Sequence, residues 1–132
     1  MKKGYKGNIE KLTEENRDFR QVLYTGEHSQ LVLMTLRKGE EIGEEVHAGN
    51  DQFFRFENGV GRVLINDTVY EVGPGDAVIV PSGAKHNIIN TGEGALKLYT
   101  IYSPAHHQDG TVHTTLSEAL AAKEEFDGTT TE

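Results

Sequence analysis

The chain contains no cysteine in its 132 residues. Disulfide bonds, thiolate metal ligands and a cysteine nucleophile are therefore excluded. A reducing cytoplasm is compatible with this composition. The length is typical of a single domain, long enough to bury a core but too short for two full domains.

Basic residues are scarce, with 13 Lys and Arg against 21 Asp and Glu, which gives a formal net charge of -8. Nucleic acids and anionic membranes are bound by clusters of cationic side chains, and this chain has no such cluster, so we expect neither partner. Long apolar runs are also missing, since residues 31–34 with Leu36 are far too short to span a bilayer. Residues 1–6 are basic but lead into a polar stretch, which is not the pattern of a signal peptide. We expect a soluble, cytoplasmic protein.

Turn-forming residues divide residues 30–103 into short segments with β-strand patterns. One face of residues 52–57 carries Gln52, Phe54 and Phe56. Residues 62–65 and 68–72 flank Asn66-Asp67, a pair suited to the positive φ values of a tight hairpin turn. This spacing predicts an all-β barrel or sandwich.

Residues 30–36 are apolar on both of their alternating faces. A strand of this kind is usually covered on both sides. In so small a barrel the outer cover is often another subunit, so the pattern predicts a homodimer.

The flanking segments are more polar. Residues 1–29 are expected to form an N-terminal arm and a first strand, with at most one helical turn near residues 13–16. Residues 104–132 are expected to form a His-rich loop, a short helix and a polar tail. The helix would open with a capping box at residues 115–118, continue over residues 119–125, and leave residues 127–132 frayed. Its docking side chains would be Leu116, Leu120 and Phe126.

Four side chains are candidate metal ligands. Period-two geometry places Glu45 and His47 on one face of a strand, and Gln52 follows after a short turn. His86 comes just after a turn at residues 81–83 and is a candidate for the opposite wall of the barrel. Two imidazoles and one carboxylate suit Fe(II), Mn, Ni or Zn, and Gln52 would add a weak neutral oxygen. Taken singly, Glu45 reads as part of a solvated acidic run, and each histidine as a structural one.

The joint spacing resembles the two signature motifs of the cupin superfamily. The family's first motif has His-x-His, three or four residues, Glu, six residues and Gly. Its second motif has Gly, five residues, Pro-x-Gly, two residues, His, three residues and Asn. The matching positions are Glu45, His47, Gln52 and Gly59 in the first motif, and Gly75, Pro81, Gly83, His86 and Asn90 in the second.

The resemblance covers residues 30–103 and implies a double-stranded β-helix with a metal in the barrel mouth. The whole chain also resembles small bacterial cupins that end in Pro-x-His-His-x-Asp-Gly-Thr-Val-His, here residues 104–113. Such proteins are often described by analogy as mannose-6-phosphate isomerase-like. Two positions depart from the family pattern. Glu45 replaces the first histidine, which preserves two histidines and one carboxylate, and Gln52 replaces the usual glutamate.

The segment after the last strand carries His106, His107 and His113. One reading is that His106 overhangs the barrel mouth as a general acid or base. The alternative is that these histidines fix the loop to the barrel through ring hydrogen bonds. Tyr99 and Tyr102 fall on opposite faces of the last strand, so only one of them can face the barrel interior.

Three functional hypotheses follow. The first is a metal-dependent enzyme acting on a small oxygenated molecule. Isomerisation of a sugar or keto acid would use Tyr99, Tyr102 or His106 as the base, whereas dioxygenation would need Fe(II) with open positions. The second is a non-catalytic module that binds a small ligand or a metal. The third is a structural barrel without metal, which the Gln52 exchange keeps open.

Overall fold

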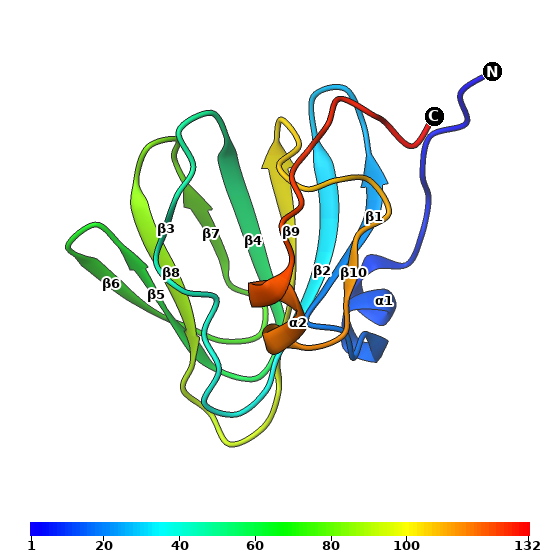
Figure 1. The fold of residues 1–132 in the computed structure, drawn as a ribbon. Coiled ribbons are helices and arrows are strands. Elements are labelled where there is room, and N and C mark those ends of the chain that lie inside the picture. The colour runs from blue at the N-terminus through cyan, green and yellow to red at the C-terminus, as the bar shows by residue number, and fades with distance from the viewer.

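Two antiparallel β-sheets face each other in the computed structural model, which describes residues 1–132 (Figure 1). One sheet has six strands in the order β10-β1-β2-β9-β4-β7, and the other has four in the order β3-β8-β5-β6. The elements are α1 Ile9–Glu15, β1 Arg20–Thr25, β2 Gln30–Leu36, β3 Glu45–Val46, β4 Asp51–Asn58, β5 Gly61–Ile65, β6 Thr68–Val72, β7 Ala77–Val80, β8 Lys85–Asn90, β9 Leu96–Ser103, β10 Val112–His113 and α2 Leu116–Ala121. The predicted all-β double-stranded β-helix with a short C-terminal helix is confirmed. Neither helix is long and apolar enough to cross a membrane.

The core lies between the sheets and is built by alternation along the strands. On β4 the inward residues Gln52, Phe54 and Phe56 are all buried, whereas their outward neighbours are partly exposed. The same period appears on β9, where every second residue from Leu96 to Tyr102 is buried. Burying an aromatic side chain such as Phe54 stabilises the fold by about 2 kcal/mol or more. The two sheets are therefore held together by the face that the sequence pattern predicts.

The predicted hairpin at Asn66-Asp67 is also confirmed. Ile65 of β5 pairs with Thr68 of β6, which leaves a two-residue loop between the strands. Asn66 has a φ of 51°, the left-handed conformation that such a loop needs and that asparagine tolerates well. This turn fixes the register of β5, which pairs on its other side with β8 and thereby positions that strand.

Strand β2 is covered on both faces, but its outer cover comes from the same chain. Leu33 and Thr35 lie on the outer face and are 2% and 7% exposed. Helix α1 packs across β2, β4 and β9 on this side. The Asn16 amide donates to the Thr35 hydroxyl at 3.1 Å, and that hydroxyl donates to the Asn16 carbonyl at 2.8 Å. The homodimer stays a prediction. The outer apolar face of β2, from which it was predicted, is covered by α1 of the same chain.

The N-terminal helix is longer than the single turn predicted near residues 13–16. It begins at Ile9 because the Asn8 side chain accepts a hydrogen bond from the Lys11 N–H and caps the first turn. Thr13 is fully buried beneath it. The inner face combines this polar residue with the half-buried Ile9 and Leu12, so its apolar signal is weak.

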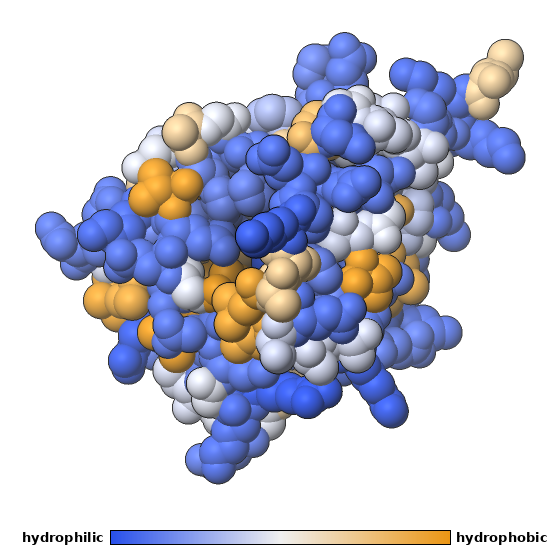
Figure 2. All heavy atoms as spheres, viewed as in Figure 1, coloured by the Kyte–Doolittle hydropathy of each residue, from blue (hydrophilic) through white to orange (hydrophobic).

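Helix α2 begins as predicted but ends early. The Thr115 hydroxyl accepts from the Glu118 N–H at 3.1 Å, as expected of a capping box. The helix ends at Ala121, four residues before the predicted end. Leu116 and Ala119 pack against the core, whereas Leu120 is 74% exposed, so the prediction that Leu120 docks the helix is wrong. In Figure 2 hydrophobic side chains on this face are scattered among hydrophilic ones.

The C-terminal tail is bound to the barrel, so the prediction of a frayed end is wrong. Thr131 exchanges two hydrogen bonds with the backbone of Thr25, at 2.8 and 2.9 Å. The Glu132 carboxylate accepts from the Tyr24 hydroxyl at 2.7 Å and from the backbone N–H groups of Lys3 and Gly4. These partners lie more than 100 residues away in the sequence, so no local pattern predicts them.

Candidate metal centre

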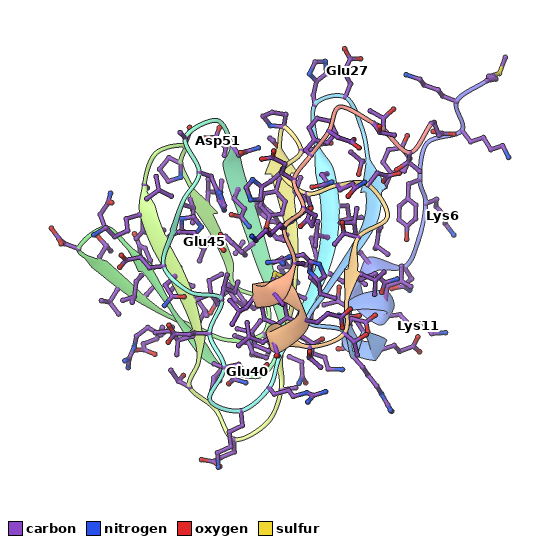
Figure 3. All side chains as sticks on the ribbon, in the orientation of Figure 1. Lys6, Lys11, Glu27, Glu40, Glu45 and Asp51 are labelled. Carbon is purple, nitrogen blue, oxygen red and sulfur yellow. The ribbon has the colours of Figure 1, made fainter.

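Three of the four predicted ligands converge between the sheets. The candidate ligand atoms of Glu45, His47 and His86 all lie within 4.8 Å of one another. Glu45 pairs directly with His86 in the β3–β8 register, which brings the two sequence motifs together. His47 and His86 are 8% and 4% exposed. Figure 3 shows Glu45 between the two sheets, whereas Lys6, Lys11 and Glu27 lie at the periphery.

The turn before His86 ties the two motifs together. Gly83 has a φ of 86°, which favours glycine, and its N–H donates to the backbone carbonyl of His47 at 2.9 Å. The Ser82 hydroxyl donates to the Ala48 carbonyl at 2.6 Å. The second motif therefore holds the first one in place through the backbone.

His86 has a defined orientation. Its Nδ1 lies 3.1 Å from the Ala84 carbonyl, which only accepts hydrogen bonds, so Nδ1 carries the proton. The lone pair is then on Nε2. A backbone carbonyl bound to the second ring nitrogen is the usual support of a metal-bound histidine.

His47 Nε2 is a buried polar atom without a hydrogen-bond partner. The Glu45 carboxylate oxygen lies only 2.8 Å away, yet the two groups are not aligned as a hydrogen bond. Ligand atoms around a cation have this arrangement: they lie close together, but each points toward the ion instead of toward the other. Burial acts to raise the pKa of Glu45, but the nearby His47 and the charge of Arg20 lower it overall, so the carboxylate is ionised at pH 7.

Gln52 contributes the second unpartnered atom. Its side chain is buried, and its Nε2 donates to the Thr100 hydroxyl at 3.0 Å. Its Oε1 is buried with no hydrogen-bond partner. An orphaned amide oxygen normally costs about 1–3 kcal/mol, and coordination to a cation would remove that cost. The cluster of two imidazoles and one carboxylate therefore fits a divalent metal, with Fe, Mn, Ni and Zn all compatible, and Gln52 offers an unpartnered amide oxygen from β4.

His106 and Tyr102 cover this cluster. The ring centroid of His106 lies 4.2 Å from that of His47 and 5.3 Å from that of Tyr102, on which it stacks. Burial, with smaller contributions from His107 and His47, lowers the pKa of His106 to about 4, so its ring is neutral at pH 7. Burial raises the pKa of Tyr102, which stays protonated. Asn50 anchors this loop by donating to the Ala105 carbonyl at 3.2 Å.

The other candidates lie elsewhere. Tyr99 is on the outer face of β9, where its ring lies 6.2 Å from that of Phe53, so the structure does not bring it to the cluster. The ring of His107 is held by hydrogen bonds to Tyr102 and Glu124. The ring of His113 is held by a hydrogen bond to Arg20. Three buried or half-buried neighbours of the site carry no signal in the sequence, namely Arg20, Thr100 and Glu124.

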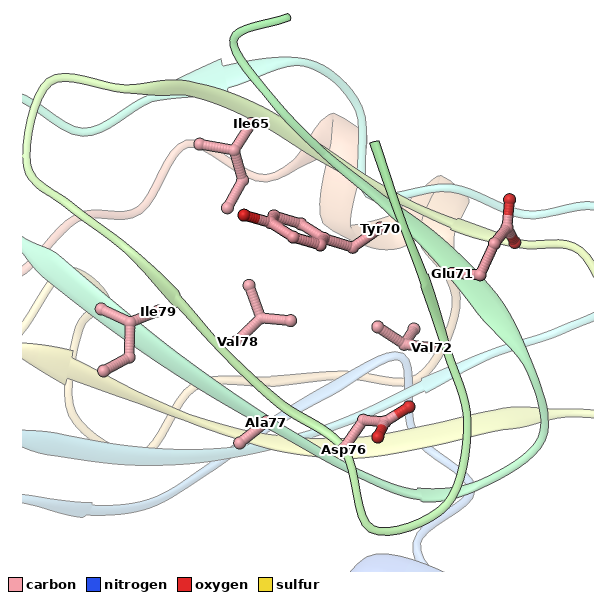
Figure 4. A pocket seen from close by; sticks show the side chains of 8 residues that line it. All are labelled: Ile65, Tyr70, Glu71, Val72, Asp76, Ala77, Val78 and Ile79. Atoms are coloured by element: carbon pink, nitrogen blue, oxygen red, sulfur yellow. The ribbon is translucent and has the colours of Figure 1, made fainter. Parts of the chain in front are cut away.

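A cavity of about 380 Å³ opens between β6 and β7, the edge strands of the two sheets (Figure 4). Six of its eight lining residues are hydrophobic. In the close-up the Tyr70 hydroxyl points toward Ile65, whereas the Glu71 side chain points away from the cavity. Ile65 pairs with His86 in the β5–β8 register, so one lining residue is the strand neighbour of a candidate ligand, although no candidate ligand lines the cavity itself.

The fold and the centre together define a double-stranded β-helix with a mixed histidine and carboxylate site at its mouth. Residues 32–102 match the family described as the cupin domain, which is more than half of the chain. The chain belongs to the cupin family.

Two relatives share much of the sequence. The uncharacterised protein YrkC of Bacillus subtilis is 44% identical over 126 residues, and the match spans 89% of this chain but only 66% of that protein. The crystal structure of BH2720 from Bacillus halodurans is 44% identical, covers 91% of this chain and 96% of that chain, and has a TM-score of 0.89. A structure from Thermotoga maritima, described as a predicted oxalate decarboxylase, is 25% identical, covers 57% of this chain and 65% of that one, and has a TM-score of 0.55.

Proposed function

We propose that this cupin is a metal-dependent enzyme acting on a small oxygenated molecule that binds the metal. The observation that carries the proposal is the pair of buried, unpartnered atoms, His47 Nε2 and Gln52 Oε1, in a site that also holds Glu45 and His86. Leaving the buried Gln52 oxygen orphaned would cost about 1–3 kcal/mol, which a bound cation would offset. When bound, the metal would polarise a carbonyl or enol oxygen as a Lewis acid.

The protein's own groups would hold and orient the substrate. Tyr102 and the neutral His106 lie over the ligand cluster and supply polar groups for proton or hydrogen-bond exchange. The apolar cavity behind Ile65 supplies room for the carbon skeleton of a ligand. The Thermotoga relative, described as a predicted oxalate decarboxylase, supports a small oxygenated acid as the kind of substrate. Dependence of turnover on O2 separates dioxygenation from isomerisation.

A non-catalytic metal or ligand-binding module is the second candidate. It is favoured by the partial cover over the centre, because none of the three cavities is lined by Glu45 or His47, and His86 lines only a small one of about 100 Å³. Substrate entry from the mouth would require the His106 loop to move. Turnover in a substrate screen with metal-loaded protein, against binding without turnover, separates the two functions.

The first test is metal analysis of protein purified without added metal. We expect wild-type protein and a His28→Ala control to carry a divalent metal, because His28 is exposed and remote from the centre. A His47→Ala/His86→Ala double variant should not carry it. Equal and negligible metal content in all three preparations, even after incubation with Fe(II), Mn(II), Ni(II) or Zn(II), would remove the physical basis of both metal-dependent functions.

A further inference from the structure

A buried chain of hydrogen bonds leads from the C-terminal segment to the metal centre. Glu124 Oε1 lies 2.6 Å from His107 Nδ1, and His107 Nε2 lies 3.1 Å from the Tyr102 hydroxyl. The side chains of His107 and Glu124 are 7% and 15% exposed, and Tyr102 is 2% exposed. Removal from water makes the direction of each hydrogen bond energetically significant.

Glu124 fixes the direction of the whole chain. Its second oxygen accepts from the Gln108 N–H at 2.7 Å. Burial acts to raise its pKa, but the hydrogen bonds from His107 and Gln108 prevail and hold the pKa of Glu124 at about 2. An ionised carboxylate only accepts, so His107 Nδ1 carries the proton.

The next link follows from the charge of His107. Burial lowers the pKa of His107 despite its acidic partner, so the ring is neutral at pH 7. With the proton on Nδ1, Nε2 can only accept, and the Tyr102 hydroxyl must donate to it. The Tyr102 proton therefore points toward His107.

The Tyr102 oxygen then offers only lone pairs to the rest of the interior. Its ring lies edge-on to His47, with centroids 5.9 Å apart, and Tyr102 pairs with Gln52 in the β4–β9 register, so this side chain lies beside two of the candidate ligands. A buried group that can only accept a hydrogen bond discriminates in favour of a ligand that can donate one.

We propose that Tyr102 determines specificity by accepting a hydrogen bond from a hydroxyl group of the metal-bound substrate. His107 and Glu124 are positioning residues that set this polarity. The inference rests on the proposed function and narrows its substrate class to hydroxyl-bearing molecules, such as 2-hydroxy acids, over the corresponding keto compounds.

The Glu124→Gln variant tests the polarity without removing a contact. The Gln108 N–H needs an acceptor, so the new amide must keep its oxygen there and turn its N–H₂ toward His107 Nδ1. His107 would then carry its proton on Nε2 and donate to Tyr102, whose own O–H would turn toward the interior. Glu125→Gln is the matched control, because Glu125 is the exposed neighbour.

Two readouts follow this reversal. Side-chain ¹⁵N NMR of His107, which needs no metal, should show the proton on Nδ1 in wild-type protein and the control, and on Nε2 in Glu124→Gln. Calorimetry on Mn(II)-loaded protein should show wild-type binding lactate more tightly than pyruvate by roughly 2- to 12-fold, the range expected of one neutral hydrogen bond. This preference should vanish in Tyr102→Phe and vanish or reverse in Glu124→Gln.

Three results would overturn the inference: a wild-type His107 protonated on Nε2, equal binding or no binding of the two probes by metal-loaded wild-type protein, or a lactate preference that survives Tyr102→Phe. If Glu124→Gln does not fold, the wild-type spectrum and the Tyr102→Phe variant still decide the matter. Failure of the wild-type protein to take up metal would instead refute the proposed function, and the NMR experiment would still report on the polarity.

Discussion

Replacing Gln52 by glutamate tests directly whether this side chain faces a metal. Gln52 is 3% exposed, donates to Thr100 through Nε2, and leaves Oε1 unpartnered. In Gln52→Glu the Nε2 donor is lost, and a second carboxylate is buried in the interior that holds Glu45. Without metal, this carboxylate has no hydrogen-bond donor in place of the lost contact, because the Thr100 hydroxyl is the only side-chain partner of Gln52 among the hydrogen bonds.

The Gln52→Glu substitution should lower the stability of the metal-free protein but raise its affinity for metal. A buried carboxylate without a partner costs several kcal/mol, so the metal-free variant should lose about 3 kcal/mol of unfolding free energy, or roughly 10 °C in Tm for a chain of this length. Unit charges about 4 Å apart attract by roughly 4 kcal/mol at an effective dielectric constant of 20. A divalent ion beside the new carboxylate therefore more than offsets its desolvation, and metal affinity should rise at least about tenfold, or about 1.4 kcal/mol.

Thermal melts and calorimetry with Zn(II) provide the assay. Wild-type protein should gain about 2.7 kcal/mol of stability when free metal is at roughly 100 times Kd, and the variant should gain more at the same metal concentration. Gln21→Glu, a half-buried glutamine on β1, is the control and should change neither quantity by more than about 0.5 kcal/mol. A variant with a lower Tm but wild-type metal affinity would refute the placement of Gln52 as a ligand.

Three further predictions concern the rest of the chain. The pKa of Glu124 is about 2 instead of the ordinary 4.5, so its stabilising contribution is fully present above pH 4.5 and is lost as the pH falls toward 2. After allowance for its partial exposure this amounts to roughly 1–2 kcal/mol, and acid unfolding curves of Glu124→Gln should lack that slope, whereas those of Glu125→Gln should keep it. In urea titrations, Leu116→Ala should lower the free energy of unfolding by about 1–3 kcal/mol, because Leu116 packs against the core. Leu120→Ala should lower it by less than about 0.5 kcal/mol, because Leu120 is exposed. Equal effects of the two substitutions would contradict the packing of α2. Sedimentation at micromolar concentration should give twice the chain mass of 14.6 kDa if the predicted homodimer forms, and a monomer mass would contradict it.

The sequence predicted those parts of the fold that local periodicity and turn chemistry decide. Strand β4 alternates because Phe54 and Phe56 must share the face of Gln52, whatever else the chain does. The Asn66 turn follows from the left-handed conformation that a two-residue hairpin requires. Both features depend on residues within a few positions of one another, which is the range over which sequence patterns are informative.

Features that depend on contacts between residues far apart in sequence were not predictable in this way. The tail is ordered by Thr25 and Tyr24, and β2 is covered by α1; neither contact leaves a periodic signal. The site shows the same division. Spacing within two motifs predicts Glu45, His47 and His86, whereas Thr100 and Glu124 reach the site only through the tertiary fold.

The two departures from the family pattern are best understood as one change. The family's first motif supplies its carboxylate at the position of Gln52 and an imidazole at the position of Glu45. Here the carboxylate is on β3 and the neutral donor is on β4. The ligand set therefore still carries one negative charge, but the carboxylate lies on the four-stranded sheet instead of the six-stranded one. The exchange is therefore compatible with the proposed metal centre, and it places the neutral Gln52 on the side of the site that also carries Tyr102, where a ligand oxygen would meet the hydrogen-bond acceptor set by His107 and Glu124.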